Sequence, residues 1–391
     1  MLGYPNRKFF DAVCDLKTLQ ENPEDMELLR KLQLSLRDNL IRIEIKKKER
    51  KQKYSGKFHH NNFVSYYTDE SDDLGVLFFQ KLQYQFRMIG DSIAFLYLDR
   101  FSIKHALYNT ENQRPKSANT SLGDKEGAEK EVEFLLETLE AHIPAVLCDL
   151  TNSLRHGDVC LCTSNDPYLI EVKSSKTTSS RTKRQVRRLR KLNKFYAQDE
   201  ANDFRGMPYV RRRTLKTKLI YYEDHINRLI FEARSAGFAY GSPEEGLSYL
   251  VLFDEEVSLM DVICQVGFQR PLIFFLNEDK AQNCWEPYYP YTLSIKRPED
   301  VCDFIRGRFV ICVILDLSYM VSLARSSGLF MDFEDTPDGY IARLVGDESE
   351  GQMHVSEMFF KRIGNEFLSP KSLVQEISQR FKNISGEDEG P

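Results

Sequence analysis

Two short apolar segments surround a turn near the middle of the chain, and both carry charged residues. Residues 156–162 read HGDVCLC, residues 168–175 read YLIEVKSS, and the turn between them contains Ser-Asn-Asp-Pro at 164–167. Apolar runs of this length on either side of such a turn predict a β-hairpin. Because a shift of one residue would move every side chain to the other face, the charged residues limit how the two strands can pair.

The charged residues of this hairpin are Asp158 on the first strand and Glu171 and Lys173 on the second. A turn centred between Asn165 and Asp166 predicts that Asp158 lies across from Lys173 and diagonal to Glu171. Glu171 and Lys173 are two residues apart and therefore share a face. Since opposed side chains lie about 4.5–5.5 Å apart and diagonal ones about 7–8 Å, all three groups are expected to converge.

Two carboxylates and an ammonium on otherwise apolar strands are costly to bury unless a metal ion or an anionic substrate engages them. Mg²⁺ takes oxygen ligands and is usually held by one or two carboxylates together with substrate phosphate. Such a metal can polarise a phosphoryl oxygen and activate a water, which the lysine would position. The alternative is a buried ion triad that serves only the structure of the sheet.

Helices are predicted on both sides of the hairpin. Residues 123–143 carry apolar residues at helical spacing, residues 145–151 read as a strand with a polar end, and residues 182–198 form a second helix. The expected order is therefore a helix, three strands and a helix.

This order, together with Asp158 and the Glu171-x-Lys173 pair, resembles the PD-(D/E)XK, or restriction-endonuclease-like, nuclease superfamily over residues 123–200. One departure is Gly157, which stands where the motif often has proline. The resemblance implies an α/β fold with a restriction-endonuclease-like αβββαβ core, in which helices flank a mixed central sheet, and with additional mixed α/β regions on either side. It also implies that Asp158 and Glu171 bind Mg²⁺ or Mn²⁺ and that Lys173 orients the attacking water.

Further site residues follow from the same resemblance. Many members carry a glutamate on the first helix in a pattern like E-x-x-V-x-x-L-L, which residues 129–136 match. Glu129 is accordingly the candidate for catalysis and metal binding, and Glu133 is the alternative. Gln185 is similar in position to a glutamine of the RecB-like group, with Tyr196 further along the same helix.

Charge is distributed unevenly along the chain. The whole sequence has 54 Lys and Arg against 59 Asp and Glu, a net charge of −5. Between residues 171 and 218, however, sixteen Lys and Arg stand against four acidic residues. Such a segment is typical of a surface that binds a polyanion, the alternative being a solvated basic helix face. The residues expected to contact nucleic acid are Lys176, Arg181, Lys183, Arg184, Gln185, Arg187, Arg188, Arg190, Lys191 and Lys194.

The remaining sequence is expected to form flanking regions. We predict a mostly helical region over 1–108, a linker over 109–122, the nuclease-like domain over 123–254 and an α/β region of unknown role over 255–391. The aromatic run at 288–291, near the single tryptophan Trp285, is interpreted as a packed turn, with base stacking as the alternative. Strands are predicted at 248–254, 270–277, 291–295, 308–317 and 339–345, and helices at 24–46, 215–237, 298–306 and 370–382.

Cysteines and apolar runs indicate the cellular environment. The eight cysteines are scattered without a CxxC pair, which indicates reduced thiols rather than a disulfide framework or a zinc site. No apolar stretch approaches the roughly 20 residues of a membrane helix, and the first residues lack the apolar core of a secretory signal. We therefore expect a cytoplasmic protein that does not bind membranes.

The resemblance and the charge distribution together predict a metal-dependent nuclease that hydrolyses phosphodiester bonds to leave a 3′-hydroxyl and a 5′-phosphate. DNA is favoured over RNA because of the resemblance, and so is a role in genome defence or DNA repair. The flanking regions are expected to bind a partner protein or a second copy of the chain. The alternative is a non-catalytic nucleic-acid clamp or scaffold subunit of a larger complex, built on a nuclease-like fold. The expected enzyme is a Mg²⁺-dependent endonuclease, with exonuclease action as the alternative.

Overall fold

The chain divides into two compact units. The computed structural model describes residues 7–55, 70–117, 122, 127–172, 180–215, 217–253, 261–262, 264, 267–279, 285, 287–333, 340–346 and 351–387. Unit 1 comprises Met1–Arg213 and Ala281–Cys302, and unit 2 comprises Thr214–Lys280 and Asp303–Pro391. The chain therefore passes between the units three times. These limits differ from the expected boundaries, because the helical N-terminal region and the nuclease-like segment up to residue 213 lie in one unit.

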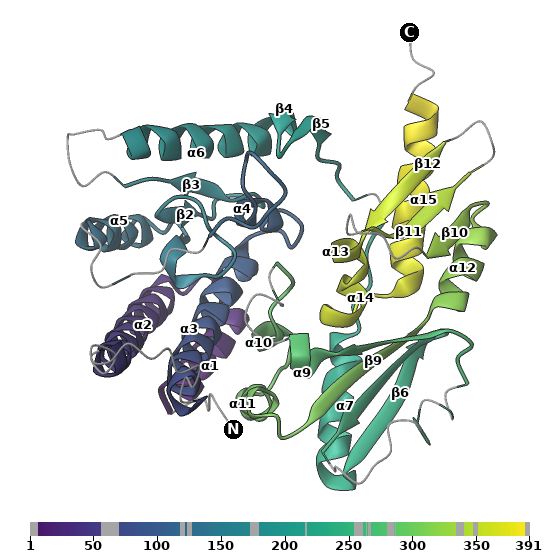
Figure 1. Cartoon of the computed structure of the whole chain (residues 1–391), viewed down its shortest axis with the longest axis horizontal. Coiled ribbons are helices and arrows are strands. Elements are labelled where there is room, and N and C mark those ends of the chain that lie inside the picture. Colours follow the sequence, from purple (N-terminus) through teal and green to yellow (C-terminus); the bar gives the residue numbers. More distant parts are fainter. Residues whose placement is uncertain are drawn as a thin grey trace, which may run out of the picture. The chain divides into compact units, whose positions relative to one another are not determined.

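Three long helices form one half of unit 1. They are α1 (Arg7–Glu21), α2 (Met26–Ser55) and α3 (Glu70–Tyr97), drawn in purple and blue in Figure 1. The predicted helix at 24–46 is confirmed by α2. The buried face of α2 follows helical spacing of three and four residues, with Leu29, Leu32, Leu36, Leu40 and Ile43.

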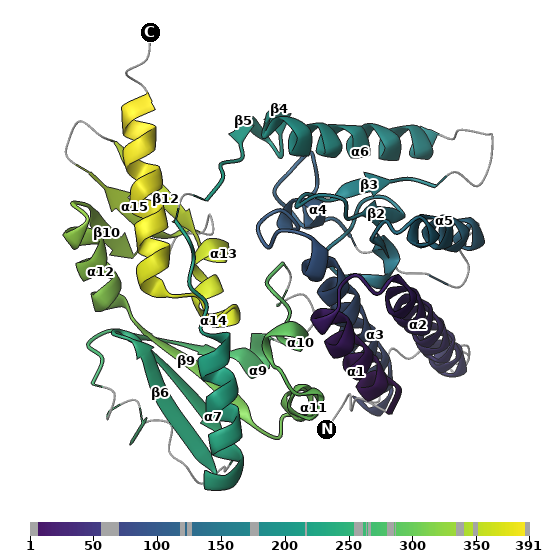
Figure 2. The same ribbon diagram turned by 180° about the vertical axis from the view of Figure 1, so that it is seen from behind.

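The other half of unit 1 holds the predicted helix, three strands and helix. These are α5 (Ala128–Glu140), β1 (Ala145–Leu147), β2 (Val159–Leu161), β3 (Tyr168–Ile170) and α6 (Ser180–Gln198), with the 3-10 turn η1 (Cys148–Leu150) after β1. The strands form an antiparallel sheet in the order β1-β2-β3. In both views α6 runs alongside β3 (Figures 1 and 2).

The expected mixed sheet is wrong for the described residues. A restriction-endonuclease-like core would add a further strand to this sheet after α6. Instead the chain turns directly into the antiparallel hairpin β4 (Glu200–Phe204) and β5 (Met207–Arg211), which forms a sheet of its own. The two strands pair with each other because a tight turn at Arg205 and Gly206, both with positive φ, returns the chain at once.

The segment expected to be a linker at 109–122 is folded over its first residues. It follows the short helix α4 (Lys104–Leu107), and Tyr108 pairs with Pro115 as an isolated antiparallel bridge. The Lys116 backbone N–H donates to the Leu107 carbonyl at 2.9 Å. We name residues 107–116 the 107–116 loop. Its polar composition suggested an open linker, but its backbone groups are paired within the loop.

The segment that returns to unit 1 packs on the long helices. Predicted as a strand, residues 291–295 instead form the single helical turn α10 (Tyr291–Ser294) after Pro290, followed by α11 (Pro298–Arg306). All four residues of α10 are buried, so the sequence shows no alternation that would distinguish strand from helix. The hydroxyl of Thr292 lies 2.5 Å from that of Ser92 on α3.

The aromatic residues of this segment are buried. Trp285 is 1% exposed and its indole N–H donates to the Tyr289 carbonyl at 2.9 Å. The Tyr289 ring makes an edge-to-face contact with Phe95 of α3 at 5.7 Å between ring centroids. This agrees with the interpretation as a packed turn and leaves no ring face open for base stacking.

Unit 2 is built on a four-stranded antiparallel sheet. Its strands are β6 (Phe238–Glu244), β7 (Leu247–Leu252), β8 (Pro271–Phe275) and β9 (Val310–Asp316), in the order β6-β7-β9-β8. Helix α7 (Glu223–Ala236) packs against β6 and β7, and the short α9 (Leu276–Asp279) follows β8. The three predicted strands at 248–254, 270–277 and 308–317 correspond to β7, β8 and β9.

A second antiparallel sheet and several helices complete unit 2. The sheet has the order β10-β11-β12, with β10 (Phe330–Phe333), β11 (Tyr340–Val345) and β12 (Gln352–Ser356). The helices are α12 (Leu317–Ser326), α13 (Glu357–Phe360), α14 (Arg362–Asn365) and α15 (Pro370–Glu387). The protein is thus a mixed α/β protein with several small antiparallel sheets. None of its described helices has the length and apolar character needed to cross a membrane.

Candidate functional site

Asp158 stands at the entrance to β2, held by backbone contacts on both sides. Its N–H donates to the Ile170 carbonyl at 2.7 Å, and its carbonyl accepts from the Cys148 N–H at 2.9 Å. Its carboxylate Oδ2 accepts from the Val172 N–H at 2.9 Å, and the residue is 7% exposed. The backbone just after β3 therefore holds the Asp158 carboxylate in place.

The hairpin register differs from the expected one. Val159 pairs with Ile170 and Leu161 with Tyr168, so Asp158 and Glu171 lie just beyond the same end of the β2–β3 ladder, in a register that does not set Asp158 across from Lys173. The expectation assumed a turn centred between Asn165 and Asp166, which would have shifted the pairing by two residues.

Contacts of the connecting loop explain the shift. The Asp166 carboxylate accepts from the Ser102 hydroxyl at 2.7 Å and from Arg212 Nη2 at 2.6 Å, and the Asn165 carbonyl accepts from the Asp99 N–H at 2.8 Å. Partners distant in sequence thus hold the loop, and local turn propensity does not set its centre.

Gly157 explains why proline is missing before Asp158. Its φ is +74°, a left-handed conformation that proline, with φ fixed near −65°, cannot adopt. A Cβ at this position would lie 2.7 Å from the Ile170 carbonyl oxygen. The close approach of the two strands at the site therefore requires glycine.

The other residues expected at the metal site are less well assembled. Glu171 is half-buried, whereas Lys173 lies outside the described residues, as does Lys176. Within the described residues, no group of three His, Cys, Asp or Glu side chains is arranged to hold a metal ion. Two of the expected carboxylates, those of Asp158 and Glu171, thus belong to the same end of the β2–β3 hairpin.

The glutamate predicted on the first helix is exposed. Glu129 lies at the start of α5, and its side chain is exposed. The side chain of Glu133 is exposed as well, whereas Glu131 is only 7% exposed. Glu131 shares the buried face of α5 with Leu135 and Leu139. The spacing of four residues between Glu131 and Leu135 is the sequence signal that would have identified it as the buried glutamate.

Lys116 is a charged neighbour of the site that sequence reasoning missed. Its ammonium donates to the Arg155 carbonyl, and Arg155 Nη1 donates back to the Lys116 carbonyl at 2.6 Å. Burial lowers the pKa of Lys116, and the charge of nearby Glu171 acts in the opposite direction. No sequence motif marks Lys116, because it comes close to Glu171 only through the folding of the 107–116 loop.

His156 has a structural role. The residue is 3% exposed, and Nε2 lies 3.0 Å from the Tyr108 carbonyl, an arrangement in which the ring donates to the 107–116 loop. Burial, reinforced by the charge of Lys116, lowers the pKa of His156 to about 4. The imidazole is therefore neutral at pH 7.

Helix α6 presents a basic face beside β3. Its apolar side chains Leu189, Leu192 and Phe195 are buried. Five of the predicted cations are exposed and form no hydrogen bond or ion pair with the described part of the chain: Lys183, Arg184, Arg187, Arg190 and Lys194. An amphipathic helix whose polar face is this rich in unpaired cations attracts anions.

Other predicted contacts on α6 are engaged within the protein. Arg188 forms a two-point ion pair with Glu111 at the tip of the 107–116 loop, at 2.7 and 3.1 Å, and Lys191 donates to the Asp203 carbonyl. Gln185 is half-buried, and nothing is described of the Arg181 side chain. The free cations thus lie on the outer face of the helix.

Two side chains attach α6 to its surroundings. Asn193 Nδ2 donates to the Leu169 carbonyl of β3 at 2.9 Å, and its Oδ1 accepts from the Leu169 N–H at 3.4 Å. Tyr196 is buried and donates to the Ser102 carbonyl at 2.9 Å, which gives it a structural role. The basic face is therefore held in a fixed place relative to the strand that leads to Glu171.

No protein-family model, curated protein or solved structure matches this chain.

Proposed function

We propose that the protein is a metal-dependent nuclease that hydrolyses phosphodiester bonds in DNA. The observation that supports the proposal most is the position of Asp158 and Glu171. Asp158 directly precedes β2 and Glu171 directly follows β3, so both stand at the same end of an antiparallel hairpin, beside a helix with five exposed and unpaired cations. Carboxylates would hold a divalent cation there, and the cations would hold the phosphates of the substrate.

Asp158 and Glu171 suit Mg²⁺ or Mn²⁺, since hard divalent cations prefer carboxylate oxygens and keep several waters. The bound metal would supply Lewis-acid activation of the phosphoryl group and of a water. Lys173 is proposed to orient that water. Lys116, whose ammonium is close enough to Glu171 to feel its charge, would add positive charge near the scissile phosphate.

The basic face of α6 is proposed to bind the DNA backbone. Arg184, Arg187 and Arg190 follow one another at spacings of three, so they lie along one side of the helix. Such contacts to phosphates give affinity without reading base sequence. Arg188 is excluded from this set because Glu111 already neutralises it.

Plasmid nicking in the presence of Mg²⁺ tests the proposal. Asp158→Asn keeps an acceptor for the Val172 N–H but removes the charge, so we expect at least about 100-fold slower cleavage, and a similar loss for Glu171→Gln. Glu137→Gln, on the exposed side of α5, is the matched control and should cleave like the wild type. Because Glu129 is exposed, Glu129→Gln should slow cleavage less than Asp158→Asn.

Two results would contradict the proposal. One is undiminished cleavage by the Asp158→Asn variant, and the other is the absence of metal-dependent cleavage of any DNA or RNA by the wild type. If the wild type binds DNA but does not cut it, the protein is a non-catalytic nucleic-acid clamp. The observation that favours this second candidate is that no three His, Cys, Asp or Glu side chains among the described residues are arranged to hold a metal ion.

A further inference from the structure

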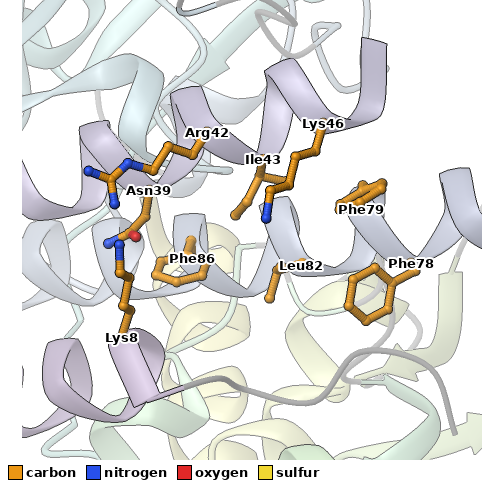
Figure 3. Close-up of a pocket in the computed structure, with 9 residues that line it drawn as sticks. All are labelled: Lys8, Asn39, Arg42, Ile43, Lys46, Phe78, Phe79, Leu82 and Phe86. Carbon is orange, nitrogen blue, oxygen red and sulfur yellow. The ribbon is translucent and has the colours of Figure 1, made fainter. Parts of the chain in front are cut away.

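Unit 1 contains a pocket between its first three helices, away from the candidate nuclease site. It has a volume of about 310 Å³ and is lined by residues of α1, α2 and α3 (Figure 3). It shares no residue with the site around Asp158. Its volume is at the lower end of the range of small-molecule sites, about 300–1,000 Å³.

The floor of the pocket is apolar. Ile43, Leu82 and Phe86 are buried there, and Phe78 and Phe79 are half-buried. Phe86 packs edge to face against Phe9 at 5.4 Å between ring centroids, so the floor belongs to the core between the helices. Rings and branched aliphatic chains of this kind favour an apolar occupant.

The rim of the pocket is positively charged. Lys8 projects from α1, and Arg42 and Lys46 project from α2 into the same hollow (Figure 3). All three are exposed, and none forms a hydrogen bond or ion pair with the described part of the chain. Arg42 and Lys46 are four residues apart on one helix, where like charges repel. None of the nine described lining residues carries a carboxylate that would offset them.

Uncharged polar groups are scarce in the lining. Asn39 is the one uncharged polar side chain among the nine described residues, and its Nδ2 already donates to the Ser35 carbonyl at 2.8 Å. A sugar or a nucleobase would leave most of its hydrogen-bonding groups unpaired there, which is unfavourable. An occupant with one anionic head and an apolar body would instead pair its head with the cationic rim and its body with the apolar floor.

We propose that this pocket binds a small amphiphilic organic anion, with its head group at Lys8, Arg42 and Lys46 and its apolar body against Phe78, Phe79 and Leu82. The proposal does not depend on the nuclease function. A medium-chain carboxylate has this chemistry, and octanoate is a soluble probe of it.

Calorimetric titration of the full chain with octanoate tests the proposal. One octanoate should bind per chain, at least about tenfold more tightly than 1-octanol, which lacks the charge, and than inorganic phosphate, which lacks the apolar body. The double variant Arg42→Gln/Lys46→Gln should bind octanoate at least about tenfold more weakly, since it loses two charge-assisted contacts. Lys8→Gln, on a different helix, should also weaken binding.

Arg37→Gln is the matched control, because Arg37 is on α2 but does not line the pocket. It should leave the octanoate affinity unchanged. Equal affinity for octanol and octanoate, equal affinity for phosphate and octanoate, or wild-type affinity in the double variant would each overturn the proposal. All the substituted residues except Arg37 are exposed and Arg37 is half-exposed, so thermal unfolding should confirm that every variant keeps its fold.

Discussion

Gly157 holds the backbone immediately before Asp158 in a conformation that other residues adopt only at a cost. Two separate effects act there, the positive φ and the contact that a Cβ would make with the Ile170 carbonyl. Since the same carbonyl accepts the Asp158 N–H, a movement of the backbone at Gly157 would displace the carboxylate that anchors the proposed metal.

Gly157→Ala should therefore destabilise the protein and slow cleavage together. We expect a loss of about 2–4 kcal/mol in the free energy of unfolding, of which about 1–2 kcal/mol comes from the positive φ alone. The measurement is denaturant unfolding of the full chain alongside plasmid nicking. Both readouts should change, because the contact with Ile170 links the fold to the site.

Gly307→Ala separates the two effects. Gly307 also has a positive φ, +71°, but a Cβ there would meet nothing within 4 Å. Its substitution should cost only the conformational part and leave the cleavage rate unchanged. A loss of stability for Gly157→Ala no larger than that for Gly307→Ala would show that the contact with the neighbouring strand is unimportant.

At the level of elements, α6 is the part of the molecule that the proposed function uses most directly. Its inner face packs on β3 and its outer face carries the unpaired cations, so the charge can be changed without disturbing the packing. This separation allows binding to be tested apart from folding.

The triple variant Arg184→Gln/Arg187→Gln/Arg190→Gln should weaken DNA binding and make it less sensitive to salt. If each arginine contacts one phosphate, the slope of log K against log salt concentration should fall in magnitude by about 2.7. The measurement is filter binding of duplex DNA over a series of salt concentrations.

A control of equal charge checks that position matters. The triple variant Lys51→Gln/Arg325→Gln/Lys371→Gln removes the same three charges from exposed sites on α2, α12 and α15. Its salt slope should match that of the wild type. Equal slopes for the two triple variants would mean that net charge, and not the face of α6, governs binding.

Elements whose signal is local could be predicted from the sequence. The apolar spacing of α2, α5 and α6 and the apolar runs of β7, β8 and β9 correspond to the predicted helices and strands. Features that depend on distant partners could not. The hairpin register is set by Asp166 and its contacts with Ser102 and Arg212, and α10 is buried on every side, so that neither leaves a periodic pattern.

The same distinction between local signals and distant partners holds for the candidate site. Asp158 and Glu171 form a motif of short spacing, and they lie just beyond the same end of the β2–β3 ladder. Lys116 reaches the neighbourhood of Glu171 from a loop about fifty residues earlier in the chain, and nothing in its own surroundings marks it. Helix periodicity alone could have identified Glu131 as the buried glutamate, because it lies four residues before the buried Leu135.

For the whole molecule, the return of residues 281–302 to unit 1 is the main constraint. The Lys17 ammonium donates to the Leu293 carbonyl at 3.1 Å, and Tyr289 packs on Phe95. A fragment ending at Arg213 would lack these partners and leave apolar side chains of α1 and α3 uncovered. Unit 1 is therefore not encoded by one continuous stretch of chain.

The fragment 1–213 should consequently unfold at a lower temperature than a fusion that joins 1–213 to 281–302 through a Gly/Ser linker of about 20 residues. Thermal unfolding followed by circular dichroism gives the comparison. In the fusion, Tyr289→Ala should remove much of the gain, because the ring that covers Phe95 is lost. An equal unfolding temperature for the fragment and the fusion would contradict the assignment of 281–302 to unit 1.

The buried position of Trp285 has a practical consequence. It is the single tryptophan of the chain, it lies in the returning segment, and it contacts Tyr291 edge to face at 5.2 Å. Excitation near 295 nm would therefore report on this one place in the molecule. A red shift in its emission that precedes the loss of helix signal would show that the segment 281–302 detaches first. The native chain therefore already contains an optical label for the detachment of this segment from unit 1.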